Sequence, residues 1–196
     1  MHEHVSDEFV KRAQRDGYRE SSAYKLLEID DKDHLIKPGM TVVDLGAAPG
    51  SWSQVALQRM KNNGRVIALD LLEMQPIAGV EFIQGDFRDE PVLQQLENLL
   101  AGKPIDLVIA DMAPNISGVS IVDQSRAAHL TELALEFSIE WLKPGGHFLV
   151  KVFAGSGFDE IVKNMRVHFE KVATRKPKAS RDRSSEVYLL GLRRKE

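Results

Sequence analysis

Lys151 lies inside the apolar segment 147–153, which has the pattern of a buried strand. Burying an ammonium group in a strand is costly unless an opposite charge accompanies it. Asp111 follows a second apolar run, 105–110, and could supply that charge from a neighbouring strand. The pair could be a purely structural ion pair. It is also a pair suited to proton transfer, because a desolvated lysine beside a carboxylate can change its protonation state.

Small residues follow another apolar run, 41–45, and read Gly46-Ala-Ala-Pro-Gly50. Small side chains let a ligand approach the backbone, and the N-terminus of the helix expected after them attracts an anionic group. The segment matches neither the dinucleotide-binding Gly-x-Gly-x-x-Gly pattern nor a P-loop, which argues against a dehydrogenase. A tight turn without a ligand is the alternative for this segment taken alone.

Acidic residues end the next two predicted strands. Asp70, about 20 residues beyond the small-residue turn, is suited to accept hydrogen bonds from a ribose diol. Asp86 could accept a hydrogen bond from an adenine amino group, with Phe87 packing beside it. Each aspartate alone could be an ordinary cap. Together with the small-residue turn they predict a pocket for a ligand that contains adenosine.

Strands alternating with helices must position these residues. Strands are predicted over 41–45, 65–70, 80–84, 105–110, 147–153, near 170–174 and over 186–192, and helices over 51–61, 90–100, 125–142 and 158–168. Such an order predicts an α/β fold with a mostly parallel sheet and helices on both faces. Ligands of such sheets bind beyond the carboxyl ends of the strands.

The composition fits one soluble domain of 196 residues without cysteine, which excludes disulfides and thiolate chemistry. We find no secretory signal, no membrane span and no convincing metal-ligand cluster, and we expect a cytoplasmic protein. The net charge of −3 hides a balance of +6 over residues 171–196. A second basic group comprises Lys11, Arg12, Arg15, Arg19 and Lys25. If the fold joins the two ends, they form a basic face for RNA, whereas a solvated surface is the alternative.

Four motifs, taken together, resemble the FtsJ (RlmE) family of RNA ribose 2′-O-methyltransferases. They are Asp44-Leu-Gly-Ala-Ala-Pro-Gly50, Asp111-Met-Ala-Pro-Asn115, Val150-Lys-Val-Phe153 and Ser184-Ser-Glu-Val-Tyr188. The resemblance extends from about His4 to Leu192. It implies a Rossmann-like class I methyltransferase with a seven-stranded sheet whose last strand is antiparallel. Residues 37–196 would form this core, after a helical, partly basic segment over 1–36.

The resemblance also implies the residues of the site. A catalytic Lys-Asp-Lys-Glu tetrad falls on Lys25, Asp111, Lys151 and Glu186. S-adenosylmethionine is the implied cofactor, and its expected contacts are Gly46, Gly50, Trp52, Asp70, Asp86, Phe87 and Asp111. Lys151 would accept the proton of the attacking 2′-hydroxyl or, if charged, would stabilise the developing oxyanion.

The substrate implied is a uridine of 23S rRNA in the large ribosomal subunit or a late precursor, methylated by a monomeric enzyme of the bacterial heat-shock type. We expect Arg175, Lys176, Lys178, Arg181 and Arg183 to face phosphates. A tRNA or mRNA-cap methyltransferase and a non-catalytic ribosome-assembly factor that binds RNA are the alternatives. The tetrad is intact, which argues against the last of these.

The sequence departs from the family pattern in two places. Ser51 stands where the family pattern has glycine, and the stretch Arg19-Glu-Ser-Ser22 replaces a more basic one before Lys25. The first change should leave cofactor binding intact, and the second could alter an RNA contact. Bacterial members usually carry a longer basic leader before His4, so we expect a trimmed chain.

Overall fold

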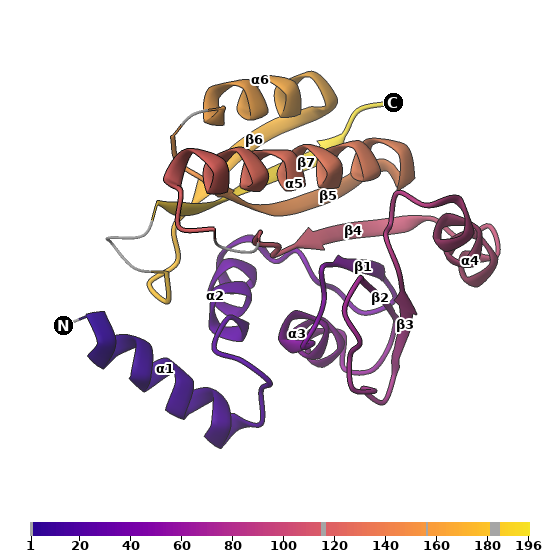
Figure 1. Ribbon diagram of the computed structural model, residues 1–196. Coiled ribbons are helices and arrows are strands. Elements are labelled where there is room, and N and C mark those ends of the chain that lie inside the picture. The colour runs from indigo at the N-terminus through magenta and orange to yellow at the C-terminus, as the bar shows by residue number, and fades with distance from the viewer. Residues whose placement is uncertain (1, 115–116, 156, 181–184) are drawn as a thin grey trace.

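The computed structural model describes residues 2–114, 117–155, 157–180 and 185–196, and within 2–7 only the backbone (Figure 1). Seven strands form one sheet in the order β3-β2-β1-β4-β5-β7-β6. The strands are β1 (Thr41–Leu45), β2 (Arg65–Asp70), β3 (Val80–Gln84), β4 (Ile105–Ala110), β5 (Leu142–Phe153), β6 (Phe169–Arg175) and β7 (Glu186–Arg194). β7 runs antiparallel to both of its neighbours, and the other pairs are parallel. The predicted fold class, including the antiparallel last strand, is confirmed.

Helices cover both faces of the sheet. They are α1 (His2–Asp16), α2 (Ala23–Asp33), α3 (Ser51–Arg59), α4 (Glu90–Leu100), α5 (Ser120–Trp141) and α6 (Phe158–His168). Side chains of α4, α5 and α6 pack on one face, and those of α2 and α3 pack on the other. Successive residues of a strand point to opposite faces, so in β1 Val43 joins the first cluster and Val42 the second.

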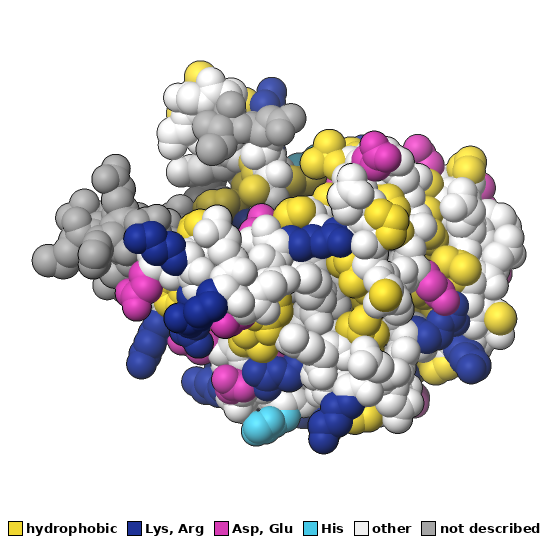
Figure 2. All heavy atoms as spheres, turned by 90° about the horizontal axis from the view of Figure 1, so that it is seen from below, with side chains coloured by type: hydrophobic (Ala, Val, Ile, Leu, Met, Phe, Trp, Pro, Cys, Tyr) yellow, Lys and Arg dark blue, Asp and Glu magenta, His cyan; other side chains and the backbone are white. Residues whose placement is uncertain are grey.

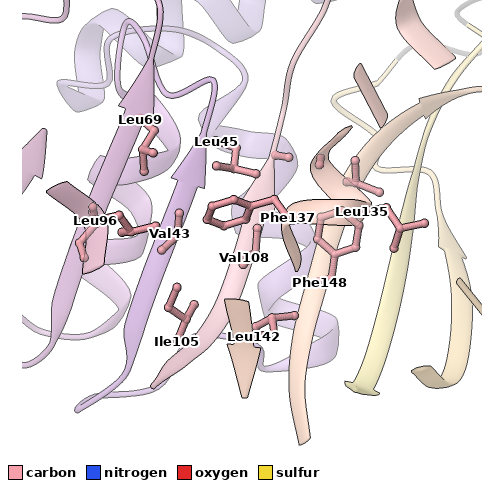
Figure 3. Packing of buried hydrophobic residues seen from close by; sticks show 14 of the residues in the cluster. Val43, Leu45, Leu69, Leu96, Ile105, Val108, Leu135, Phe137, Leu142 and Phe148 are labelled. Atoms are coloured by element: carbon pink, nitrogen blue, oxygen red, sulfur yellow. The ribbon is translucent and has the colours of Figure 1, made fainter. Parts of the chain in front are cut away.

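The larger core lies under α5. Figure 3 shows Phe137 of this helix over the sheet, close to Leu45, Val108 and Phe148. Burying such a side chain contributes about 1.5–3 kcal/mol. In α4, Val92, Leu96 and Leu100 are buried four residues apart, because that spacing keeps side chains on one helix face.

Two predicted boundaries were wrong. α5 begins at Ser120 rather than at 125. The sequence pattern did not show this start because the first residues of the helix are mostly exposed and have no apolar periodicity. β5 begins at Leu142, which pairs with Ile105, so the segment after Trp141 belongs to the strand rather than to a helix end. A register irregularity between Ile105 and Leu107 accommodates this early start.

The two N-terminal helices lie below β5 and β7 in the view of Figure 1. Side chains of α2 share a core cluster with Tyr188 and Leu190 of β7. α1 contacts α2 through the rings of Phe9 and Tyr24, whose centroids are 5.7 Å apart, and Tyr24 donates a hydrogen bond to Asp16. In the described ranges, no helix combines the length and the apolar character needed to cross a membrane.

Candidate functional site

A cavity of about 700 Å³ opens at the carboxyl ends of the central strands. Its volume lies within the range of about 300–1,000 Å³ that is usual for small-molecule sites. Five of the seven predicted cofactor contacts line it: Gly46, Asp70, Asp86, Phe87 and Asp111. Lys25 and Lys151 line it as well. Most of the residues predicted to bind a cofactor and three of the four predicted to react therefore share one cavity.

Gly46 lets the chain turn where β1 meets the cavity. Its φ is +69°, and a Cβ on it would lie 2.2 Å from Cγ of Met112. The amides of Gly46 and Ala47 both donate to the carbonyl of Leu69, at 2.8 and 3.2 Å. The loop is thus held against β2, and only glycine fits at this position.

The two aspartates at the ends of β2 and β3 differ in their partners. Asp70 accepts the amides of Ala48 (2.8 Å) and Leu72 (2.9 Å), which fixes its carboxylate toward the cavity with capacity for further hydrogen bonds. Asp86 is held by the guanidinium of Arg88, with the shortest contact at 2.6 Å. The hydrogen bond from Arg88 holds the pKa of Asp86 below its ordinary value, so Asp86 is an ionised acceptor.

Gly50 and Trp52, predicted as cofactor contacts, do not line the cavity within the described part of the chain. Trp52 is only 2% exposed and packs against Tyr188, with ring centroids 5.7 Å apart and ring planes tilted by 35°. Its indole nitrogen donates to the carbonyl of Ser22 at 2.9 Å. The side chain of Trp52 therefore anchors the segment before Lys25 to α3.

The four predicted tetrad residues meet in one network of charges. Lys25 Nζ lies 2.7 Å from Glu186 Oε1, and Lys151 Nζ lies 3.3 Å from Asp111 Oδ1 and 3.8 Å from Glu186 Oε2. The Lys151 side chain is 9% exposed. Burial acts to raise the pKa of Glu186, but the charges of Lys151 and Lys25 hold it below its ordinary value. Two lysines and two carboxylates thus pair with one another in a largely buried network.

Tyr188 completes this network and was missed from sequence. It is fully buried, and its hydroxyl lies 2.8 Å from Asp111 Oδ1 and 3.2 Å from Glu186 Oε1. Burial raises its pKa well above the ordinary value, and the charges of Asp111 and Glu186 raise it further, so it remains a donor. Its position two residues after Glu186, on the same side of a strand, was the available signal.

Asp44, the last but one residue of β1, was also given no role. It is 1% exposed, and Ser53 donates a hydrogen bond to it at 2.8 Å. Burial raises its pKa to about 8, opposed by the Ser53 hydrogen bond and assisted by the charges of Asp111 and Asp70. Asp44 is therefore a neutral acid in the folded protein over most of the physiological range.

Replacing Asp44 with asparagine should make stability less dependent on pH. Unfolded, the aspartate ionises near pH 4, so between about pH 4 and about pH 8 the folded state binds the extra proton and stability falls as pH rises. Asparagine keeps an oxygen for Ser53 but never ionises. We expect the free energy of unfolding of Asp44→Asn, relative to wild type, to increase between about pH 5 and about pH 8 in urea titrations. Asp89→Asn, at an exposed site, is the control, and parallel pH profiles for all three proteins would contradict the assignment.

The two departures from the family pattern touch each other. Ser51 is 1% exposed, and its hydroxyl lies 2.7 Å from that of Ser22. Glu20 accepts from Ser22 at 2.9 Å and from Ser51 at 3.4 Å. The changed residues therefore form one small hydrogen-bonded group beside the cavity.

The basic C-terminal segment contacts α2. Arg175 pairs with Asp33 through two contacts of 2.8 Å, and the amide of Lys178 donates to Glu28. These contacts join the two ends of the chain, as a shared basic face requires. Lys176 donates to the carbonyl of Glu186. The phosphate contacts expected of Arg175, Lys176 and Lys178 stay predictions. Arg181 and Arg183 lie outside the described residues.

Basic side chains on the face seen in Figure 2 are mixed with acidic ones, including at the left, where α1 lies in Figure 1. Arg12 and Arg15 both pair with Asp16, for example. Within the described ranges, no group of three or more histidine or acidic side chains is arranged to hold a metal ion.

Solved structures with this fold define the class of the protein. A ribosomal RNA methyltransferase from Plasmodium falciparum superposes with a TM-score of 0.81 at 34% identity, over 90% of this chain and 98% of its own. A fibrillarin pre-rRNA processing protein from Methanococcus jannaschii superposes with a TM-score of 0.55 at 18% identity, over 83% of this chain and 70% of its own, and shares the fold. The sheet is that of a Rossmann-like methyltransferase.

Comparison of sequences is more specific. A family model described as FtsJ-like methyltransferase matches residues 18–194, and the chain therefore belongs to this family. A relative from Methylobacillus flagellatus, named ribosomal RNA large subunit methyltransferase E, is 79% identical over 100% of this chain and 94% of its own length. A relative of the same name from Nitrosospira multiformis is 62% identical over 100% of this chain and 95% of its own length. The predicted family is confirmed.

Proposed function

We propose that the protein transfers a methyl group from S-adenosylmethionine to the 2′-hydroxyl of a uridine in 23S rRNA of the large ribosomal subunit or a late precursor. The observation that carries the proposal is the buried network of Lys25, Asp111, Lys151 and Glu186 at one end of a cavity. Relatives that match the whole chain carry the name ribosomal RNA large subunit methyltransferase E.

The cavity has the donor set for this cofactor. Asp70 would accept from the ribose hydroxyls and Asp86 from the adenine amino group, while Phe87 would pack against the base and Gly46 leaves room at the backbone. Gly50 and Trp52 would act as structural residues of the loop after β1 and of α3. Trp52 is buried, and Gly50 packs closely against Ile77, so neither is expected to contact the ligand through a side chain. Bound S-adenosylmethionine would supply an electrophilic methyl group.

The chain itself must activate the ribose hydroxyl, which is a poor nucleophile. We propose that Lys151, in its neutral amine form, accepts the proton, because it lines the cavity and is otherwise screened from water. Asp111 and the Oε2 atom of Glu186 orient the Lys151 amine, and Lys25 binds the other carboxylate oxygen of Glu186, Oε1. Tyr188 fixes the separation of the two carboxylates by hydrogen bonding to both. The role of these groups is then to orient and to take up a proton.

A methylation assay with four acceptors tests the proposal. The protein and a methyl-labelled donor are incubated in parallel with large subunits, naked rRNA, tRNA and capped RNA. We expect label in the large subunit, at one phosphodiester that becomes resistant to alkali, because alkaline cleavage needs the free 2′-hydroxyl. Label on tRNA or capped RNA alone would reassign the substrate, and RNA binding without transfer to any acceptor would indicate a non-catalytic assembly factor.

We further propose that the enzyme acts as a monomer in the cytoplasm, where large subunits mature.

A further inference from the structure

Glu20 lies on the wall of the cavity, just before α2. Its Oε1 atom accepts hydrogen bonds from the hydroxyls of Ser22 and Ser51, at 2.9 and 3.4 Å. Ser51 is buried at the first turn of α3, so the carboxylate is fixed to the loop that follows β1. Within the described ranges Glu20 has no ion pair and no donor to Oε2. A carboxylate held in this way has one oxygen ready for a cationic donor.

The field around Glu20 also favours a cation. Burial is the main cause of the raised pKa of Asp44, but the charges of Asp111, Asp70 and Glu20 add to it. Glu20 also lines the same cavity as Asp70 and Asp111, which lie at the ends of β2 and β4. The nearby cations already have partners. Lys25 and Lys151 pair with Glu186 and Asp111, and Arg88 pairs with Asp86. The guanidinium of Arg19 donates to the backbone carbonyls of Pro49, Gln75 and Pro76. A positively charged group between Glu20 and these strand ends would be stabilised.

The order of the strands limits which part of the cofactor can reach Glu20. Asp86, Asp70 and Asp111 lie at the ends of β3, β2 and β4, and would meet the adenine, the ribose and the methyl group in turn. The amino-acid end of the cofactor is left for the loop after β1 and the segment around Glu20. That end carries an α-ammonium and an α-carboxylate. The start of α3 beside Ser51 suits the carboxylate, because helix N-termini attract anions.

We propose that Glu20 binds the α-ammonium group of S-adenosylmethionine through Oε2 and so selects ligands with an intact amino-acid end, an inference that rests on the proposed function. The Ser22–Ser51 pair holds the carboxylate in place for this contact. Ser51, at the position where the family pattern has glycine, supports this contact.

The test measures the affinity of the full chain for two ligands by calorimetry. One is S-adenosylhomocysteine, and the other is its deamino analogue, in which hydrogen replaces the ammonium group. Wild type should prefer S-adenosylhomocysteine by roughly tenfold, the low end for a charge-assisted hydrogen bond because Glu20 is solvent-exposed. Glu20→Gln should bind the two ligands about equally, whereas Glu136→Gln, an exposed change on α5, should keep the preference.

Two failures can be told apart. If Asp70→Asn weakens both ligands alike while Glu20→Gln keeps the wild-type preference, the cofactor site stands and the role of Glu20 is overturned. If wild type binds neither ligand, or Asp70→Asn binds both as wild type does, the proposed cofactor site itself is overturned. Thermal unfolding of each variant checks that it is folded, and the ratio of the two affinities is unaffected by any inactive fraction.

Discussion

Replacing Lys151 with alanine should lower the rate of methyl transfer by about 10³-fold or more, while S-adenosylhomocysteine binds within about twofold of wild type. The lysine is 9% exposed and contacts both Asp111 and Glu186, and the carboxylates or water left in its place are much weaker bases than an amine. Single-turnover transfer to large subunits measures the rate, and calorimetry measures the affinity. Because the change also leaves two carboxylates facing each other, stability should fall as well.

Two further variants separate chemistry from charge. Lys103→Ala, at an exposed position in the loop before β4, removes a lysine outside both basic groups and should retain full activity. Lys151→Arg places a permanent positive charge at this position that cannot accept a proton near neutral pH, so we expect it to be nearly as slow as the alanine variant. Substantial activity in Lys151→Arg would assign the lysine to oxyanion stabilisation, and full activity in Lys151→Ala would remove it from the reaction.

Replacing Gly46 with alanine should abolish measurable binding of S-adenosylhomocysteine. The new Cβ would lie 2.2 Å from Cγ of Met112, and the residue would also have to adopt a φ of +69°. Relief requires Met112 to move into the cavity or the loop to leave β2, and either change closes the space for a ligand. Calorimetry measures the loss, and unfolding in urea shows whether the fold persists.

Gly39 supplies a matched control for this experiment. Its φ is +88°, but a Cβ there meets no atom within 4 Å. Gly39→Ala therefore introduces backbone strain of about 1 kcal/mol without a steric clash, and it should bind ligand normally. If both alanine variants bind equally well, close packing at Gly46 is not what shapes the cavity.

The central strands could be predicted from sequence because each is an apolar run bounded by turn residues. The strands over 41–45, 65–70, 80–84 and 105–110 have the predicted bounds. The start of α5 could not be predicted, since Ser120 to Gln124 face solvent and carry no periodic signal. Leu142 was assigned to a helix because its pairing with Ile105 is a long-range contact that no local pattern shows.

The residues of the candidate site also form two groups, those that a local sequence pattern indicates and those that it does not. Lys151 and Asp111 stand out in sequence because a lysine in an apolar strand needs a partner, and the structure places them 3.3 Å apart. Lys25 and Glu186 carry no such local signal, and only the family resemblance pointed to them. Tyr188 was missed because a buried tyrosine in a strand is usually part of the core. Its register opposite Lys151 in β7 is a property of the folded sheet.

The position of β7 determines when the protein can become active during its own synthesis. β7 is the last strand made, yet it lies between β5 and β6, and it carries both Glu186 and Tyr188. Lys25 is made early and must wait for a partner 161 residues later in the chain. A nascent chain that has not yet reached Glu186 can already contain the acids at the ends of β1 to β4. It cannot assemble the proposed reaction centre, so we expect methyl transfer only after translation has passed β7.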